Sequence, residues 1–98
     1  MRKVTEGMVN ALKAGRDYAN GNTVVIGNAV SLFGHHIATV RADVVWVSSC
    51  GWHSATTKDR LNAILRAFCD DQLYNKKWRW FLNDGRPFYD EMLCARVK

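Results

Sequence analysis

The stretch "TVVIGNAVSLFGHHIATVRADVVWVS", residues 23–48, decides the fold. It holds four short runs rich in β-branched residues, which are Thr23–Ile26, Ala29–Phe33, His36–Val40 and Val44–Ser48. Only two or three residues separate one run from the next. Spacings this short allow only antiparallel neighbours, because a parallel crossover needs about a dozen residues or more. The stretch therefore predicts a four-stranded antiparallel meander.

A helix is predicted on each side of the meander. The first helix has Thr5 as its cap and Gly15 at its end, where a left-handed backbone is needed. Its apolar side consists of Met8, Val9, Ala11 and Leu12. The second helix has an apolar stripe at helical spacing, formed by Leu61, Ile64, Leu65 and Phe68. For this helix, Thr56 or Thr57 is the predicted N-cap.

The C-terminal segment is predicted to be a β-hairpin. "KKWRWFL" (76–82) is the first strand, "NDGRP" (83–87) contains the turn, and "FYDEMLCARV" (88–97) is the returning strand. Asn-Asp-Gly is a strong turn signal. The sequence as a whole predicts one α+β domain over residues 1–98: an N-terminal helix, a four-stranded antiparallel meander, an amphipathic helix and a C-terminal β-hairpin.

Composition narrows the class of protein. The net charge is +5, with a pI near 9.4, and such an excess attracts phosphate polyanions and acidic protein surfaces. The longest apolar run, Val44–Val47, is far shorter than the ~20 residues that span a bilayer, so no membrane association is expected. Three cysteines without a secretory signal favour reduced thiols in a cytoplasm. Two of them, Cys69 and Cys94, are expected to be small buried hydrophobes.

The first candidate site is the start of the second helix. Ser54, Thr56 and Thr57 supply hydroxyl groups there, and Lys58 and Arg60 add positive charge. Together with the free backbone N–H groups of a helix start, they would form a cradle for an anion or for an acidic partner. The alternative is that the hydroxyl groups only cap the helix and the two cations are solvated. Capping alone explains most of these residues.

The second candidate site is the segment "NKKWRWF", residues 75–81. On a single strand, Trp78 and Trp80 would share one face with Lys76, while Lys77 and Arg79 would share the other. Aromatic rings among cations can stack on bases or anchor a protein partner. The alternative is an amphipathic strand whose tryptophans belong to the core. The flanking cations favour the surface for Trp78, and the sequence leaves Trp80 undecided.

A metal site and an active site receive less support. Cys50 and His53 form half of a zinc-ligand pattern, but a structural zinc needs four ligands and no second half has ligand spacing. The same two residues could form a Cys-His dyad, although no third group is specified to orient the base. His35 and His36 read as turn residues. We therefore predict a non-enzymatic protein without a cofactor.

Four segments resemble a group of small accessory proteins of tailed bacteriophages. They are "GNTVV" (21–25), "LFGHHIA" (32–38), "SCGWHSATTKDRLNAIL" (49–65) and "WFLNDGRPFYDEM" (80–92). The resemblance implies expression inside an infected bacterium, and hence the host cytoplasm. Proteins of this kind commonly bind a host enzyme, a defence complex or nucleic acid. The resemblance assigns no role to any individual residue.

The leading hypothesis is a phage accessory protein, for host takeover or anti-defence, that binds a host protein or complex. The alternative is a nucleic-acid-binding protein that uses the basic helix start and the interleaved aromatics. Both hypotheses use the same positive, aromatic residues. An exposed edge strand of the meander would also be compatible with a homodimer.

Overall fold

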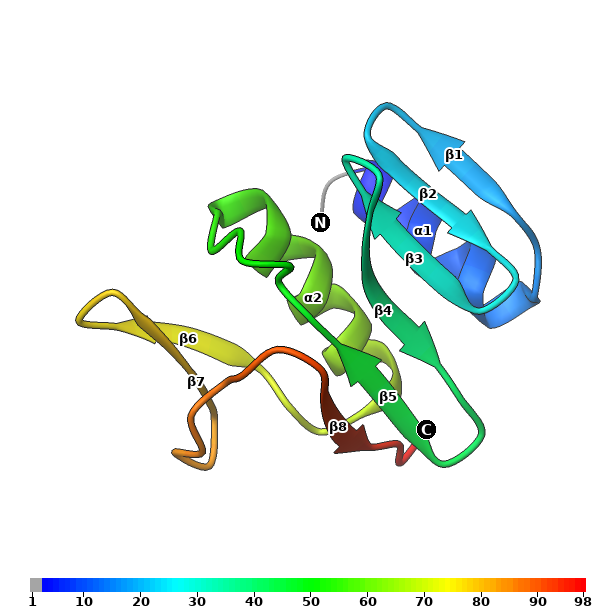
Figure 1. Cartoon of the computed structure of the whole chain (residues 1–98). Helices are drawn as coiled ribbons and strands as arrows, with labels where there is room; N and C mark the ends of the chain where they lie inside the picture. The colour runs from blue at the N-terminus through cyan, green and yellow to red at the C-terminus, as the bar shows by residue number, and fades with distance from the viewer. Residues whose placement is uncertain (1–2) are drawn as a thin grey trace.

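The computed structural model describes residues 3–98, and its α+β architecture confirms the predicted fold class. The described residues form one six-stranded antiparallel sheet, two helices and a separate two-stranded hairpin, and Figure 1 shows how these elements are arranged. The elements in chain order are α1 (Lys3–Ala14), β1 (Tyr18–Asn20), β2 (Thr23–Ile26), β3 (Ala29–Leu32), β4 (His35–Val40), β5 (Val44–Val47), α2 (Ala55–Phe68), β6 (Leu73–Lys76), β7 (Arg79–Leu82) and β8 (Met92–Ala95).

The predicted meander is present as β2–β5, and the sheet extends beyond it on both sides. The strand order is β1-β2-β3-β4-β5-β8, with every neighbouring pair antiparallel. Residues 92–95 were predicted in the returning strand of the hairpin, and that pairing is wrong. They form β8 and pair with β5, with Val45 opposite Cys94. The unpaired edge of β5 offers backbone donors and acceptors that β8 satisfies.

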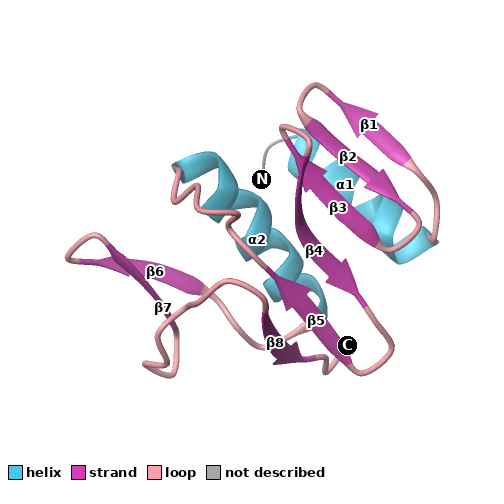
Figure 2. Ribbon diagram, in the orientation of Figure 1, coloured by secondary structure: helices cyan, strands magenta, loops and turns pink. Residues whose placement is uncertain are grey.

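Both helices pack against one face of the sheet (Figure 2). The apolar stripe predicted for α2 is buried in full. Gly15 follows α1 with φ of 69°, as predicted for a residue that ends a helix. Thr5 was predicted to cap α1, and this is wrong, because Thr5 lies inside the helix and is completely buried.

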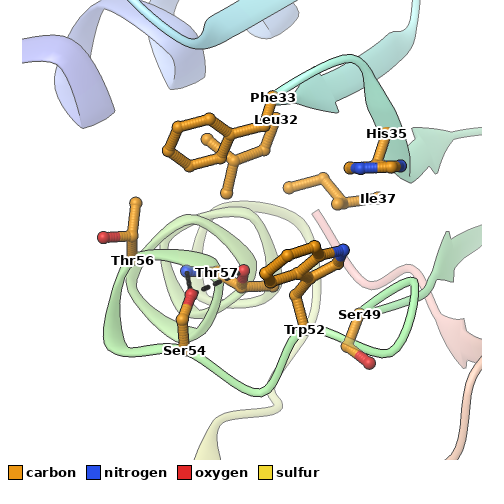
Figure 3. Close-up of a pocket in the computed structure, with 9 residues that line it drawn as sticks. All are labelled: Leu32, Phe33, His35, Ile37, Ser49, Trp52, Ser54, Thr56 and Thr57. Carbon is orange, nitrogen blue, oxygen red and sulfur yellow. Dashed lines mark hydrogen bonds between the residues drawn. The ribbon is translucent and has the colours of Figure 1, made fainter.

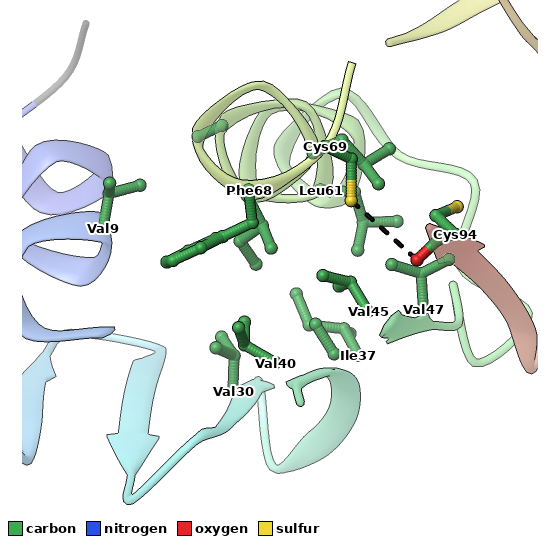
Figure 4. Close-up of a cluster of buried hydrophobic side chains, with 14 of the residues drawn as sticks. Val9, Val30, Ile37, Val40, Val45, Val47, Leu61, Phe68, Cys69 and Cys94 are labelled. Atoms are coloured by element: carbon green, nitrogen blue, oxygen red, sulfur yellow. Dashed lines mark hydrogen bonds between the residues drawn. The ribbon is translucent and has the colours of Figure 1, made fainter. Parts of the chain in front are cut away.

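The core lies between the helices and this face of the sheet (Figure 4). Val9 of α1 and Phe68 of α2 meet buried valines from the strands. Cys69 and Cys94 are fully buried, which confirms their expected role as small core residues. Burial raises the pKa of Cys69 to about 11 and that of Cys94 to about 12, with Asp71 acting in the same direction. Both thiols are therefore neutral at physiological pH.

The C-terminal hairpin is formed by β6 and β7, and we call these two strands the arm. Lys76 pairs with Arg79 across the turn residues Lys77 and Trp78. The prediction of one continuous strand over residues 76–82 is therefore wrong. The predicted Asn83–Gly85 turn does form, with Gly85 N–H donating to the Leu82 carbonyl at 2.9 Å. The chain pairs briefly with β7 after this turn and then leaves to form β8.

Candidate functional site

The helix start predicted as an anion cradle is mainly a capping structure. Ser54 is the N-cap of α2, and its hydroxyl oxygen accepts a hydrogen bond from the Thr57 backbone N–H at 3.1 Å. The prediction of Thr56 or Thr57 as N-cap is therefore wrong by two or three residues. The Ser54 and Thr57 hydroxyls also hydrogen-bond to each other at 3.0 Å. The hydroxyls of Ser54 and Thr57 thus already satisfy one another and the helix end.

Arg60 was predicted to be an exposed cation of the helix start, and this is wrong because the residue is only 5% exposed. Its Nε donates to the Thr23 hydroxyl at 3.1 Å, and its Nη1 donates to the Thr5 hydroxyl at 2.9 Å. Asp59 neutralises the guanidinium and accepts a hydrogen bond from Thr5 at 2.8 Å. Arg60 therefore joins α1, β2 and α2 from inside the fold, and its role is structural.

Lys58 is half-buried and lies near the base of the arm. It lines a polar hollow of about 330 Å³ together with His53, Asn75 and Trp80, among others. The two candidate sites therefore meet here, because Lys58 comes from the helix start whereas Asn75 and Trp80 come from the arm. The tip of the arm lies beyond this hollow, at the far end of β6 and β7 (Figure 1).

The tip of the arm carries four exposed residues of the second candidate site. Trp78 is 91% exposed, which confirms its predicted place on the surface. Lys76, Lys77 and Arg79 are exposed around it. The predicted face on which Trp78 and Trp80 lie together does not exist, because Trp78 is a turn residue. The tip is thus one aromatic ring among three cations.

Trp80 belongs to the core, which settles the question that the sequence left open. It is 4% exposed, and its ring stacks on that of His53, with the centroids 4.3 Å apart and the planes at 14°. Phe88 meets Trp80 edge-on at 5.5 Å. These contacts hold the base of the arm against the segment that precedes α2.

Cys50 and His53 are used separately. The Cys50 thiol lies 3.0 Å from the His36 carbonyl oxygen, to which it donates, whereas His53 packs on Trp80. Within residues 3–98, no three or more His, Cys, Asp or Glu side chains are grouped in a way that could hold a metal ion. Among the described residues, Cys50 and His53 therefore have no further side chains beside them that would complete a set of metal ligands.

A cavity that the sequence reasoning missed lies between the β3–β4 turn and the start of α2 (Figure 3). Its volume is about 460 Å³, and most of its wall is apolar. Leu32 and Ile37 are buried in it, whereas Phe33 and Trp52 are 59% and 63% exposed at its sides. We call it the aromatic cavity; it is lined by Leu32, Phe33, His35, Ile37, Ser49, Trp52, Ser54, Thr56 and Thr57. Phe33 beside a glycine in a turn was the signal that could have indicated it.

The residues before Trp52 are fixed by Asp90. Its carboxylate accepts hydrogen bonds from the Ser49 backbone N–H at 2.8 Å and from the Ser49 hydroxyl at 2.7 Å. Partial burial of Asp90 opposes its ionisation. The hydrogen bonds from Ser49 and Gly51 and the nearby His53 nevertheless lower the pKa of Asp90 below its ordinary value. Asp90 therefore stays ionised and holds this turn in place.

These features describe a small α+β protein, and the similarity of its sequence to phage proteins gives the class. Residues 1–95 match the model of the phage family described as Kyanoviridae Gp96 protein, and the chain belongs to this family. The predicted resemblance to small phage proteins is thereby confirmed. No curated protein and no solved structure matches the chain significantly. Over residues 3–98, neither helix is long and apolar enough to cross a membrane.

Proposed function

We propose that this phage protein acts without catalysis, in the host cytoplasm, by binding a host protein or complex through the tip of its arm. The observation that carries the proposal is Trp78, which is 91% exposed and stands among Lys76, Lys77 and Arg79. Tryptophan and arginine are the residues most enriched among those that dominate binding energy. An indole ring left almost wholly in water is costly unless another surface covers it.

The backbone of the tip supports the same proposal. Lys77 and Trp78 have φ of 52° and 68°, so both occupy the left-handed region. A two-residue turn of this kind favours Asn-Gly, and each other residue in it costs about 1–2 kcal/mol. Such outliers cluster at binding sites, where the strain is retained for what it positions. Here the strained turn positions Trp78.

The charge of the tip selects the kind of partner. Three cations surround Trp78, and the chain as a whole carries a net charge of +5. An acidic protein surface would be attracted over a distance before contact, which raises the association rate and discourages basic partners. The proposed partner is therefore a host protein with an acidic patch beside a pocket for an aromatic ring.

Trp78→Gly tests the proposal without endangering the fold, because glycine relieves the strain of the turn. A tagged protein is incubated with nuclease-treated host lysate, and the retained proteins are quantified. We expect the wild type to retain one host protein at stoichiometric level and the variant to lose it by more than about tenfold in affinity. Tyr89→Ala is the matched control, since Tyr89 is also exposed, at 62%, but lies outside the arm. Equal retention by wild type and Trp78→Gly would refute the assignment.

A second candidate, binding to single-stranded nucleic acid, rests on the same alternation of cations with a free indole ring. Bases stack on such rings while the cations neutralise phosphates. This function predicts an affinity that falls linearly with the logarithm of salt concentration, with a slope set by the number of phosphates contacted. Quenching of Trp78 emission by an oligonucleotide, absent in Trp78→Gly, would favour it. A complex that is insensitive to salt would exclude it.

A further inference from the structure

We propose that the aromatic cavity is a binding site for a small, planar aromatic molecule with little polar character, about the size of an indole. The cavity volume of about 460 Å³ falls within the range of small-molecule sites, which is about 300–1,000 Å³. The site is separate from the tip of the arm, and the inference does not depend on the function proposed for Trp78.

The shape of the wall indicates a flat ligand. Figure 3 shows the rings of Phe33 and Trp52 on opposite sides of the cavity, with Ile37 and Leu32 between them. Both residues line the cavity, and they are 59% and 63% exposed, so part of each ring is open to a ligand. Aromatic rings prefer offset-stacked or edge-to-face neighbours. A planar ring would therefore contact both walls at once.

Three hydroxyl groups of the cavity are already engaged, which argues for a largely apolar ligand. The Ser49 hydroxyl donates to Asp90, and the hydroxyls of Ser54 and Thr57 hydrogen-bond to each other. A strongly polar ligand would have to displace these bonds, because a hydroxyl that loses its partner carries a penalty. Stacking and apolar contact are thus the main interactions that the wall offers.

Three local irregularities of the backbone build this cavity. Phe33 has φ of 52°, an uncommon conformation for a bulky residue. The register of β3 and β4 shifts between Val30 and Ser31, which makes Ile37 the extra residue of a β-bulge. Bulges of this kind re-aim a side chain, and Ile37 is buried at the cavity. On the other side, Cys50 and Gly51 have φ of 53° and 81°, so they turn the chain sharply just before Trp52.

Each irregularity places one wall residue, and regular hairpins would remove the cavity. The Cys50 thiol lies 3.0 Å from the His36 carbonyl oxygen, next to the bulge, so the two irregular segments are also joined to each other. Asp90 holds the Trp52 side through Ser49. The backbone that carries the walls is therefore held in place before a ligand arrives, which reduces the entropic cost of binding.

Indole titrated into ¹⁵N-labelled full-length protein tests the proposal. We expect saturable amide shifts confined to residues 32–37 and 49–57. Phe33→Asn preserves the fold, because Asn-Gly is the preferred sequence for the turn that Phe33 and Gly34 now form. This variant and Trp52→Ala should each bind indole at least about tenfold more weakly, the usual scale for losing one stacked ring. Trp78→Gly, which leaves the cavity unchanged, should bind indole as the wild type does.

Cyclohexanol is the matched probe, since it is similar in size but not planar. We expect it to bind at least about tenfold more weakly than indole, because it cannot stack on the two rings. The proposal would be overturned by the absence of a saturable shift, by shifts centred on residues 76–79 instead, or by equal affinity for indole in Phe33→Asn. Equal affinity for cyclohexanol would likewise overturn it, because the cavity would then not select aromatic rings.

Discussion

The turns of the six-stranded sheet and the turn of the arm make the same reversal with different residues. The β2–β3 turn contains Gly27 with φ of 62°, and the β3–β4 turn contains Gly34 with φ of 78°. The arm reverses at Lys77 and Trp78, both left-handed and neither a glycine. Glycine meets no steric penalty in this conformation, whereas other residues do.

The difference distinguishes a turn that only connects two strands from a turn that also holds an exposed aromatic side chain. The β2–β3 turn only connects two strands and has Gly27 at its left-handed position, whereas the β3–β4 turn combines Gly34 with left-handed Phe33, whose ring lines the aromatic cavity. Where the turn carries Trp78, a less favourable backbone is retained beneath an exposed ring. Substitutions at the hydrogen-bonded and glycine positions of the sheet side should therefore lower stability, whereas replacing Trp78 should weaken binding of the proposed partner while it relieves the strain of the turn. The predictions below test the stability side of this comparison.

Arg60→Met should have the largest effect, and it acts wholly on the body of the fold. The change leaves Asp59 without its counter-ion and the buried hydroxyls of Thr5 and Thr23 without a donor. Breaking such a pair from one side costs about 3 kcal/mol of the free energy of unfolding. Chemical denaturation of the wild type and the variant measures this loss in the free energy of unfolding. Arg66→Met, an exposed arginine of the same helix, should change stability by less than about 0.5 kcal/mol; an equal loss in both variants would contradict the structural role of Arg60.

Gly34→Ala should have the next largest effect, with a sign opposite to that of Trp78→Gly. No atom lies within 4 Å of an added Cβ at Gly34, so the cost comes from its φ of 78° alone. We expect a loss of about 1 kcal/mol in Gly34→Ala and a gain of similar size in Trp78→Gly. Gly34→Asn is the control and should lose less, because asparagine tolerates this conformation. If Gly34→Ala and Trp78→Gly both destabilised the protein, the proposed difference between the two turns would be wrong.

Asp90→Asn should have the smallest effect of the three, and its effect should be present at neutral pH and disappear in acid, where Asp90 of the wild type is itself protonated. The hydrogen bonds from Ser49 lower the pKa of Asp90, so ionised Asp90 stabilises the fold above its unfolded-state pKa. This stabilisation is lost as the pH falls from the unfolded-state pKa of Asp90 through its lower folded-state pKa. Stability measured at pH 7 and pH 3 should therefore fall less in Asp90→Asn than in the wild type. The exposed carboxylate of Asp43 provides the control, and Asp43→Asn should fall as the wild type does.

The parts of the fold that follow from local pattern were predictable. Runs of β-branched residues around Gly27 and Gly34 indicated β2–β5, and the apolar stripe from Leu61 to Phe68 indicated α2. The exposure of Trp78 followed from the cations beside it. In these cases neighbours in the sequence supply the deciding interactions, so a single chain carries enough information.

The predictions were wrong where residues far apart in the sequence determine the structure. Arg60 finds its hydrogen-bond partners 37 and 55 positions away, at Thr23 and Thr5, and no local pattern reveals that a cation at a helix start is buried. The turn at Lys77 and Trp78 has no glycine, proline or asparagine, so it gave no signal. The aromatic cavity depends on a β-bulge and on Asp90, which lies 41 positions from Ser49. These are tertiary features that local propensity does not encode.

The sheet order β1-β2-β3-β4-β5-β8 also has a consequence for the protein as it is synthesised. Five of the six strands leave the ribosome in the order in which they pair, so each hairpin can form as soon as it emerges. The edge of β5, with the sequence Val-Val-Trp-Val, stays open until the chain has been made as far as Ala95. An open apolar edge is a template for pairing with other chains. The interval between residues 47 and 95 is thus when the nascent chain is most exposed to misassembly, and a burst of translation from many phage transcripts would crowd such edges together.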